Sequence, residues 1–168
     1  MSLRYDVPNA APEPLRQVQL LLNTTNVESG DDWLPDWLAE RGASGELERA
    51  RELREALRVL VLANNGFALA ADSDALRVVN SAAERVSLRV DAEARVRLDG
   101  GGDAPAAVCA VALGAMLDGT WSRLKACRNC HWSFYDNSPN RSATWCSMQL
   151  CGNRTKTRAY RRRKSASR

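Results

Sequence analysis

The sequence predicts a mainly α fold of the α+β type, with a helical N-terminal domain that contains one β-hairpin, a small cysteine-rich module and a basic C-terminal helix. Three observations lead to this prediction. Apolar residues recur at helical spacing through most of the first 120 residues, the spacing changes once to strict alternation, and four of the five cysteines lie together near the C-terminus. We therefore expect two domains, residues 1–120 and residues 121–168.

The first helix is predicted over Leu15–Asn23, after a proline-rich start. A turn follows, and Asp31 or Asp32 is expected to cap a short second helix. That helix carries Trp33 and Trp37, which we interpret as core anchors because residues four positions apart lie on one face of a helix.

A longer third helix is predicted from Ser44, and Asn64-Asn65-Gly66 should end it because glycine favours the left-handed conformation at a helix C-terminus. Arg51 and Glu55 lie one turn apart on its solvent face. A fourth helix is expected over Ser73–Ala83.

Apolar and polar residues alternate over residues 88–90 and 96–98, which predicts a two-stranded hairpin with one buried face. Gly100–Gly102 should be a flexible connection and not a phosphate-binding loop, because no Lys-Ser or Lys-Thr follows. The domain ends with an alanine-rich helix over Pro105–Arg123, in which Cys109 is expected to be a core residue.

Composition excludes several classes of protein. With 45% hydrophobic residues, the chain of 168 residues can form a core and is not expected to be disordered. Its longest charge-free stretch, Ala104–Leu117, is shorter than the roughly 20 apolar residues of a membrane span. No secretory signal precedes the first helix, so we expect a cytoplasmic protein without a membrane partner.

The net charge of +4 is the sum of two parts of opposite sign. Residues 121–168 contain 12 Lys and Arg against a single acid, Asp136, which makes +11, while residues 1–120 carry −7. Such an asymmetry predicts that the basic part meets a nucleic acid or another anionic surface.

The four clustered cysteines form two pairs, Cys127 with Cys130 and Cys146 with Cys151. The two residues within the first pair allow a tight turn to aim both sulfurs at one point, and the second pair can complete a tetrahedron around Zn²⁺. Four thiolates leave no open coordination position, so we expect one structural Zn²⁺ and no catalytic metal. The unit would then be a small treble-clef-like zinc-binding module, followed by the basic helix.

Other uses of these residues fit less well. Two disulfides would require an oxidising compartment, and a thioredoxin-like motif would leave the second cysteine pair unexplained. His131 could replace one thiolate, but a residue next to a ligand in a tight turn usually points away from the metal. Arg128 or Arg154 could lie beside the charged metal site instead of contacting a partner.

Seven cations crowd into 11 residues after Cys151, and on a helix they would repel one another unless a polyanion met them. The tail could also be a solvated, disordered end. A zinc scaffold at its root would instead fix the helix so that it can enter a groove or follow phosphates. The residues expected to contact nucleic acid are Arg141, Arg154, Lys156, Arg158, Arg161, Arg162, Arg163 and Lys164.

Duplex DNA is the expected partner, and two alternatives stay open. RNA could stack unpaired bases on Trp132, Tyr135 and Tyr160. The chain could also be a protein-interaction module with an unrelated basic tail. An enzyme is not expected, because the only histidine lies inside the zinc module and acidic pairs such as Asp31 and Asp32 are better explained as helix caps.

The residues from Cys127 to Arg163 closely resemble the CGNR zinc finger, named after the tetrapeptide that is Cys151-Gly152-Asn153-Arg154 in this chain. The upstream segment LLNTTNVESGDDWL and the order of helices, hairpin and last helix resemble the ABATE domain. That domain precedes this finger in bacterial proteins regarded as stress-induced transcription regulators. Together the two resemblances cover nearly the whole chain.

The resemblance implies zinc binding by the four clustered cysteines, DNA binding by the finger and no catalytic activity. It also implies that Phe134, Trp132 and Trp145 form the small apolar core of the finger, and that Gly152 and Asn153 shape the turn into the basic helix. The N-terminal domain would sense a signal or bind a partner. The resemblance leaves its small-molecule ligand, and the formation of a homodimer, open.

Overall fold

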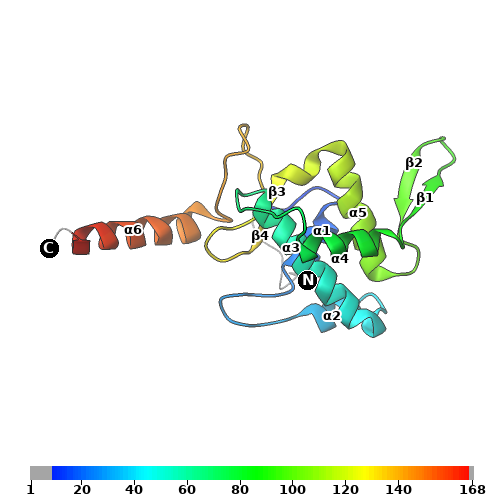
Figure 1. Cartoon of the computed structure of the whole chain (residues 1–168), viewed down its shortest axis with the longest axis horizontal. Helices are drawn as coiled ribbons and strands as arrows, with labels where there is room; N and C mark the ends of the chain where they lie inside the picture. The colour runs from blue at the N-terminus through cyan, green and yellow to red at the C-terminus, as the bar shows by residue number, and fades with distance from the viewer. Residues whose placement is uncertain (1–8, 167–168) are drawn as a thin grey trace.

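The structure is a computed structural model that describes residues 9–166, without the side chains of residues 159, 160, 162, 163, 165 and 166. Five helices of the N-terminal part pack around one core (Figure 1). They are α1 (Arg16–Leu22), α2 (Leu34–Ala39), α3 (Leu47–Ala63), α4 (Asp74–Ala83) and α5 (Ala104–Asp118), and a 3₁₀ turn, Ser44–Glu46, precedes α3. The helices predicted from the sequence are all present.

The core forms around α3, which packs against α1, α2, α4 and α5 because apolar residues recur along it at helical spacing. Trp37 is fully buried and is a core anchor as predicted, whereas Trp33 is only partly buried. Cys109 is fully buried as well, and burial raises the pKa of its thiol to about 11. The largest fully buried apolar side chains are Leu21, Leu22, Leu34, Trp37, Leu38, Leu53, Leu57, Leu124, Val18, Val61 and Phe134.

The helix expected over residues 105–123 is shorter than predicted. α5 ends at Asp118 because Gly119 adopts a left-handed backbone conformation, with a φ of 81°. The Asp118 carboxylate accepts hydrogen bonds from the backbone and hydroxyl of Thr120, at 2.8 and 2.6 Å. A 3₁₀ turn, Thr120–Arg123, then redirects the chain toward the cysteine-rich module.

The glycine-rich connection before α5, predicted to be flexible, contains a tight contact. Gly100 is buried, and a Cβ at this position would overlap the backbone of Ala106 and Ala107. Asp103 caps α5 by accepting a hydrogen bond from the Ala106 N–H at 2.9 Å. The close approach at Gly100 therefore holds the base of the preceding hairpin against the start of α5.

The predicted hairpin is present, but the prediction that one face is buried is wrong. Strands β1 (Ser87–Val90) and β2 (Val96–Asp99) pair antiparallel, with Leu88 opposite Leu98 and Val90 opposite Val96. Three of these four apolar side chains are about 70% exposed. The physical reason is that the hairpin extends beyond the body of helices (Figure 1): β2 contacts α5, but most of the apolar face of the hairpin lies outside that contact.

The C-terminal part forms a second small sheet and the basic helix. Strands β3 (Leu124–Ala126) and β4 (Ser133–Tyr135) pair antiparallel, and a single π-helical turn (Met148–Gly152) leads into α6 (Asn153–Ala166). Figure 1 shows α6 projecting from the body at the end opposite the β1–β2 hairpin. The mainly α fold with a terminal cysteine module and helix is confirmed. Leu124 and Ala126 belong to the same apolar core as the helices, and the domain division at residue 120 stays a prediction.

Replacement of Gly100 by alanine should destabilise the chain by about 2 kcal/mol, because the new methyl group meets backbone atoms, which cannot move aside as a flexible side chain can. Gly102→Ala is the matched control: no atom lies within 4 Å of its Cβ, and the change should stay within about 0.5 kcal/mol. Urea denaturation measures both. Equal stability of the two variants would contradict the tight approach at Gly100.

Candidate metal centre and nucleic-acid interface

The four cysteines of the two pairs meet at one point. Cys127 follows β3 and Cys130 precedes β4, so the turn between these strands brings both toward one side. Cys146 and Cys151 come from the segment that leads into α6. All four Sγ atoms lie within 4.8 Å of one another. His131 is not a member of this cluster, as expected for a residue beside a ligand.

The spacing of the sulfur atoms fits a tetrahedral zinc site. The Sγ atoms of Cys130, Cys146 and Cys151 are 3.5 to 3.7 Å apart. A tetrahedron with Zn–S bonds of about 2.3 Å has edges of about 3.8 Å. A disulfide would need an S–S distance of about 2.05 Å. The four cysteines would therefore hold one structural Zn²⁺, and four sulfur ligands leave no coordination position open.

The sulfur atoms also affect one another's ionisation. Hydrogen bonds with Cys130 and Cys146 lower the pKa of Cys127, whereas contacts with Cys127 and Cys130 raise the pKa of Cys146. Several thiolates at such distances are stable together only when a cation shares their charge. Zn²⁺ supplies that charge when bound, and it joins the β3–β4 turn to the root of α6.

Asn129 connects the cysteine cluster to α6. Its Nδ2 atom donates to Cys151 Sγ at 3.6 Å, and its Oδ1 atom accepts a hydrogen bond from Arg158 at 3.1 Å. Hydrogen bonds of this kind orient metal ligands. The role of Asn129 could not be predicted from the sequence, because an asparagine between two cysteines has no pattern that reveals its partners.

The small apolar core of the module differs in part from the prediction. Phe134 is buried against the cysteines, and Trp145 packs on the same cluster. The assignment of Trp132 is wrong: it packs against the large helical core, with its ring edge-to-face to Trp33 at 6.4 Å between centroids. Trp132 precedes β4 and follows the left-handed His131, so strand alternation does not decide which side it faces.

Asparagine side chains attach the β3–β4 sheet to the helices. Asn23 follows α1 and is fully buried; its Nδ2 donates to the Ser133 carbonyl at 3.0 Å, and its Oδ1 accepts from the Ser133 N–H at 2.7 Å. Asn65 follows α3 and donates to the carbonyls of Ala126 and Thr144, at 2.7 and 3.0 Å. Since Ala126 and Ser133 are register partners, the amides satisfy backbone groups on both strands.

Two arginines of α3, Arg54 and Arg58, are buried, although no sequence pattern predicts this. Arg58 donates to the carbonyl of Leu22 at 2.7 Å and to that of His131 at 3.4 Å, so it links the end of α1 to the cysteine turn. Glu55 accepts from Arg58 and from Arg54, at 3.0 and 2.7 Å. The spacing of Glu55 and Arg58 at i, i+3 was only a weak sign of a buried ion pair, because the same spacing is common on exposed helix faces.

A buried ion pair organises the loop between β4 and α6. Lys125 Nζ lies 2.7 Å from Asp136 Oδ2 and also donates to the carbonyls of Arg141 and Ala143. Burial raises the pKa of Asp136, but hydrogen bonds from Lys125 and Ser138 outweigh this effect, and the net result is a lowered pKa. Asp136 is therefore ionised at neutral pH and neutralises the buried lysine.

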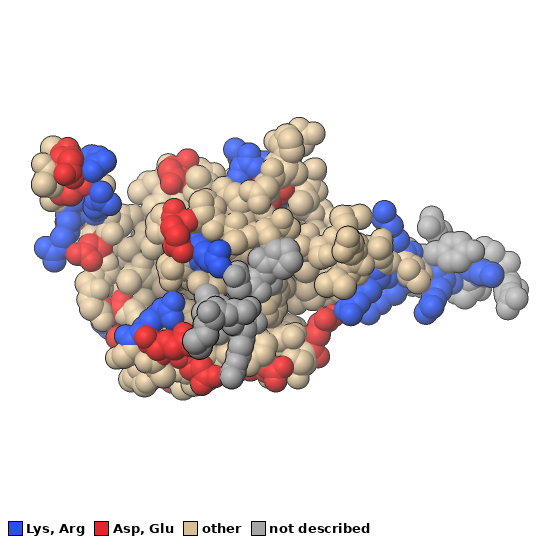
Figure 2. All heavy atoms as spheres, turned by 180° about the vertical axis from the view of Figure 1, so that it is seen from behind, with Lys and Arg blue, Asp and Glu red and all other residues tan. Residues whose placement is uncertain are grey.

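The cations of α6 whose side chains the structure describes are all exposed. They are Arg154, Lys156, Arg158, Arg161 and Lys164, while the side chains of Arg162 and Arg163 lie outside the described part. Figure 2 shows basic residues along the projecting helix, whereas acidic and basic residues are mixed over the body. Arg154 has an acidic neighbour, Glu28, at 3.4 Å, and both side chains are about half exposed.

The other residues considered for nucleic-acid contact lie in different surroundings. Arg141 is exposed in the loop after β4 and donates to Ser122 Oγ at 3.0 Å. Tyr135 is buried, and Trp132 is partly buried against the helical core, with its ring edge-to-face to Trp33. The side chain of Tyr160 lies outside the described part.

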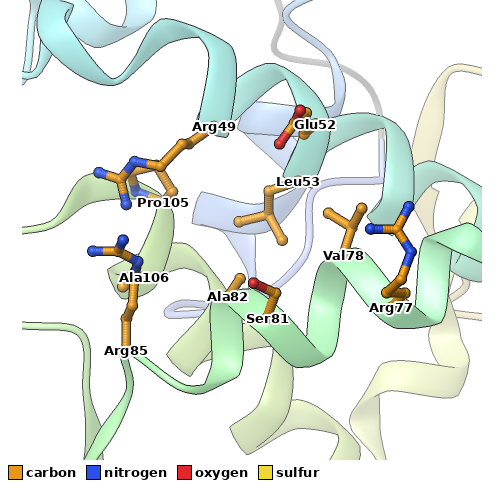
Figure 3. A pocket seen from close by; sticks show the side chains of 10 residues that line it. All are labelled: Arg49, Glu52, Leu53, Arg77, Val78, Ser81, Ala82, Arg85, Pro105 and Ala106. Atoms are coloured by element: carbon orange, nitrogen blue, oxygen red, sulfur yellow. The ribbon is translucent and has the colours of Figure 1, made fainter.

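A small pocket lies between α3, α4 and the start of α5 (Figure 3). Its volume is about 170 Å³, and Arg49, Arg77 and Arg85 lie around an apolar floor. Arg49 already pairs with Asp103 at 2.6 Å and Arg77 with Asp74 at 3.0 Å. None of the described helices is long and apolar enough to cross a membrane.

The purified chain should contain one zinc ion, and Cys127→Ser or Cys151→Ser should abolish stoichiometric binding because each removes one of four thiolates. Cys109→Ala is the control, since Cys109 lies in the helical core outside the cluster, and it should retain zinc. Metal analysis of the dialysed proteins measures the ratio. Full zinc content in both cluster variants would refute this ligand set.

Asp136→Asn should cost about 3 kcal/mol of stability, because it leaves Lys125 buried without a counter-charge. The folded pKa of Asp136 is lowered, so its ionised form stabilises the fold above the unfolded value of 3.8 and this contribution is lost as pH falls below it. The loss of stability in Asp136→Asn relative to the wild type should therefore be constant at every pH well above 3.8. Asp74→Asn, at an exposed pair with Arg77, should change stability by less than about 0.5 kcal/mol. Urea titrations that give equal losses for both variants would contradict the assignment.

Comparison with known families agrees with this geometry. Residues 123–164 match the CGNR zinc finger. Residues 16–120 match the ABATE family, whose description is "Putative stress-induced transcription regulator". No match was found among curated proteins. Because the ABATE match spans more than half of the 168 residues, the chain belongs to the ABATE family, with a CGNR zinc finger on the C-terminal side of the ABATE domain.

Proposed function

We propose that the chain is a cytoplasmic, non-catalytic transcription regulator that binds duplex DNA through its zinc finger and α6. The observation that carries the proposal is the projection of a strongly basic helix from the four-cysteine cluster, away from a body in which residues 1–120 carry a net charge of −7 (Figures 1 and 2). A membership in a family of transcription regulators supports DNA as the polyanion.

The charges on α6 favour a phosphate backbone as the partner. Lys156, Arg161 and Lys164 are exposed and have no acidic partner among the described residues. Cations held this close on one helix repel one another, and phosphates remove that repulsion while releasing counterions from the DNA. This contribution of the phosphate contacts to binding does not depend on the DNA sequence. It therefore provides affinity and orientation but does not distinguish one base from another.

The root of α6 is held by contacts that position it for binding. Cys151 lies in the turn directly before the helix, and Asn129 joins its sulfur to Arg158 in the second turn of α6. A metal ligand at this point fixes the direction of the first helical turns, whereas a free basic tail would adopt many directions. The arrangement favours one docking geometry, with Arg158 near the duplex.

Arg141 would add a phosphate contact from the loop after β4, and Arg162 and Arg163 would extend the contact surface along α6. The N-terminal domain would sense a signal or bind a partner. Since Asn23 and Arg58 connect it to the finger through Ser133 and His131, a change in the helical core can alter the position of the finger.

Binding to a duplex should weaken steeply with salt. If about six of the seven clustered cations meet phosphates, the logarithm of the binding constant should fall against the logarithm of salt concentration with a slope near −5. Fluorescence anisotropy with a labelled duplex measures the slope. A slope near zero, or binding that survives truncation after Asn153, would overturn the proposal.

Lys156→Gln combined with Arg161→Gln should make the slope less negative by about two units. Arg77→Gln is the matched control, because it removes an exposed cation of α4 and should leave the slope unchanged. Competition between duplex DNA and single-stranded RNA tests which polyanion is the partner. If single-stranded RNA displaces the labelled duplex more effectively than unlabelled duplex DNA does, the assignment to DNA is overturned.

A further inference from the structure

The segment that leads into α6 exposes side chains that phosphate contacts do not explain. Gln149, Leu150 and Asn153 are exposed, and none of them carries a charge. Leu150 is 62% exposed although it lies beside the most basic segment of the chain. The side-chain amides of Gln149 and Asn153 have no hydrogen-bond partner among the described residues. We call these three residues the neutral surface.

The other residues of the π-helical turn face the module. The sulfur of Cys151 belongs to the cysteine cluster, and Gly152 is buried. A Cβ at Gly152 would lie 2.8 Å from the sulfur of Met148, so this side of the turn is closely packed. Because a step of four residues keeps to one side of a helix, Gln149 and Asn153 share another side, on which both are exposed.

Cations follow the neutral surface directly along the helix. Lys156, Arg161 and Lys164 are exposed and have no acidic partner among the described residues. α6 has 14 residues and projects from the body (Figure 1), so it is about 21 Å long. A helix with its side chains is about 10–12 Å across, which fits the major groove of about 12 Å. Phosphates along the groove would meet the cations, and base edges would meet the uncharged side chains.

The chemistry of the neutral surface selects adenine and thymine. A carboxamide donates to N7 of adenine and accepts from its N6 amino group, whereas guanine presents two acceptors at the same edge. The methyl group of thymine is the apolar feature of the major groove, and a leucine side chain can contact it. Gln149 and Asn153 lie about 5 Å apart along the helix axis, which spans between one and two base-pair steps of about 3.4 Å.

We propose that the neutral surface reads A·T base pairs in the major groove of duplex DNA. The amides of Gln149 and Asn153 contact adenines, and Leu150 contacts a thymine methyl group. This inference rests on the proposed function, because α6 must first meet a duplex. It adds a sequence preference to phosphate contacts that bind every sequence alike. At a G·C pair, one half of each amide would stay without a partner.

Selection of sites from random duplexes with the zinc-loaded full chain supplies the probe. The selected duplexes should be enriched in neighbouring A·T pairs. Replacing their adenines by 7-deazaadenine then removes the N7 acceptor from the major groove and leaves base pairing and the minor groove intact. In fluorescence anisotropy, the wild type should bind the substituted duplex at least about tenfold more weakly, because each amide loses one of its two hydrogen bonds.

Uncharged replacements separate base contacts from phosphate contacts. Gln149→Ala combined with Asn153→Ala should bind the natural and the substituted duplex equally, while the salt dependence stays that of the wild type because no charge is removed. Asn80→Ala is the matched control at an exposed asparagine of α4, and it should keep the preference for the natural duplex. Uracil in place of thymine should weaken the wild type about threefold and leave Leu150→Ala unaffected. Circular dichroism melting and zinc content of each variant exclude unfolding as the cause.

The outcomes distinguish base readout from DNA binding as such. A wild type that binds the natural and the 7-deazaadenine duplex equally, with a steep salt dependence, would overturn the readout and leave the proposed function standing. Failure to bind any duplex would overturn both. Selected sites without A·T pairs, or a double alanine variant that keeps the preference for the natural duplex, would show that the neutral surface does not read adenine.

Discussion

The two hydrogen bonds between the Asn23 amide and the backbone of Ser133 are the constraint on which the arrangement of the molecule depends. Asn23 is fully buried at the end of α1, and Ser133 opens the strand that follows the cysteine turn. Leaving either backbone group without a partner would cost about 1–3 kcal/mol, so the helix and the strand are held in one register. The Asn65 amide donates to the carbonyl of Ala126 on the neighbouring strand, so both strands of the β3–β4 sheet are bonded to residues that follow helices. Leu124, Ala126 and Tyr135 of this sheet belong to the same apolar core as the helices.

The asparagine amides join the β3–β4 sheet to the helices, and the metal site joins the same sheet to α6. β3 and β4 flank the first cysteine pair, and the amides of Asn23 and Asn65 join their sheet to the helices without any contribution from the metal. The second cysteine pair lies on a segment with few apolar residues, for which sulfur–zinc bonds provide the stabilisation that a core would otherwise supply. The Lys125–Asp136 pair organises the loop between the two pairs. Zinc therefore determines chiefly how α6 leaves the body, and the direction of α6 determines where its positive charge is presented.

Sequence periodicity predicted the helices and the hairpin because each depends on residues close together in the chain. It could not show that the apolar face of the hairpin points into solvent, since an alternating pattern reports that one face is apolar and not what it contacts. Arg54 and Arg58 were missed for a similar reason: their partners include Asp32 and the carbonyl of Leu22, and only folding brings these groups beside α3. Trp132 was assigned to the wrong cluster because its side depends on the backbone of His131.

The sequence by itself determined the zinc ligands and the separation of charge. Both are properties of local spacing: two cysteine pairs within 25 residues favour one shared metal centre, and a run of cations stays basic in any fold. The tertiary structure alone decided which asparagines join the finger to the helices, which arginines are buried and which apolar face remains uncovered. These outcomes depend on residues that are distant in the chain, and their positions are set by packing and by the need to satisfy buried backbone groups.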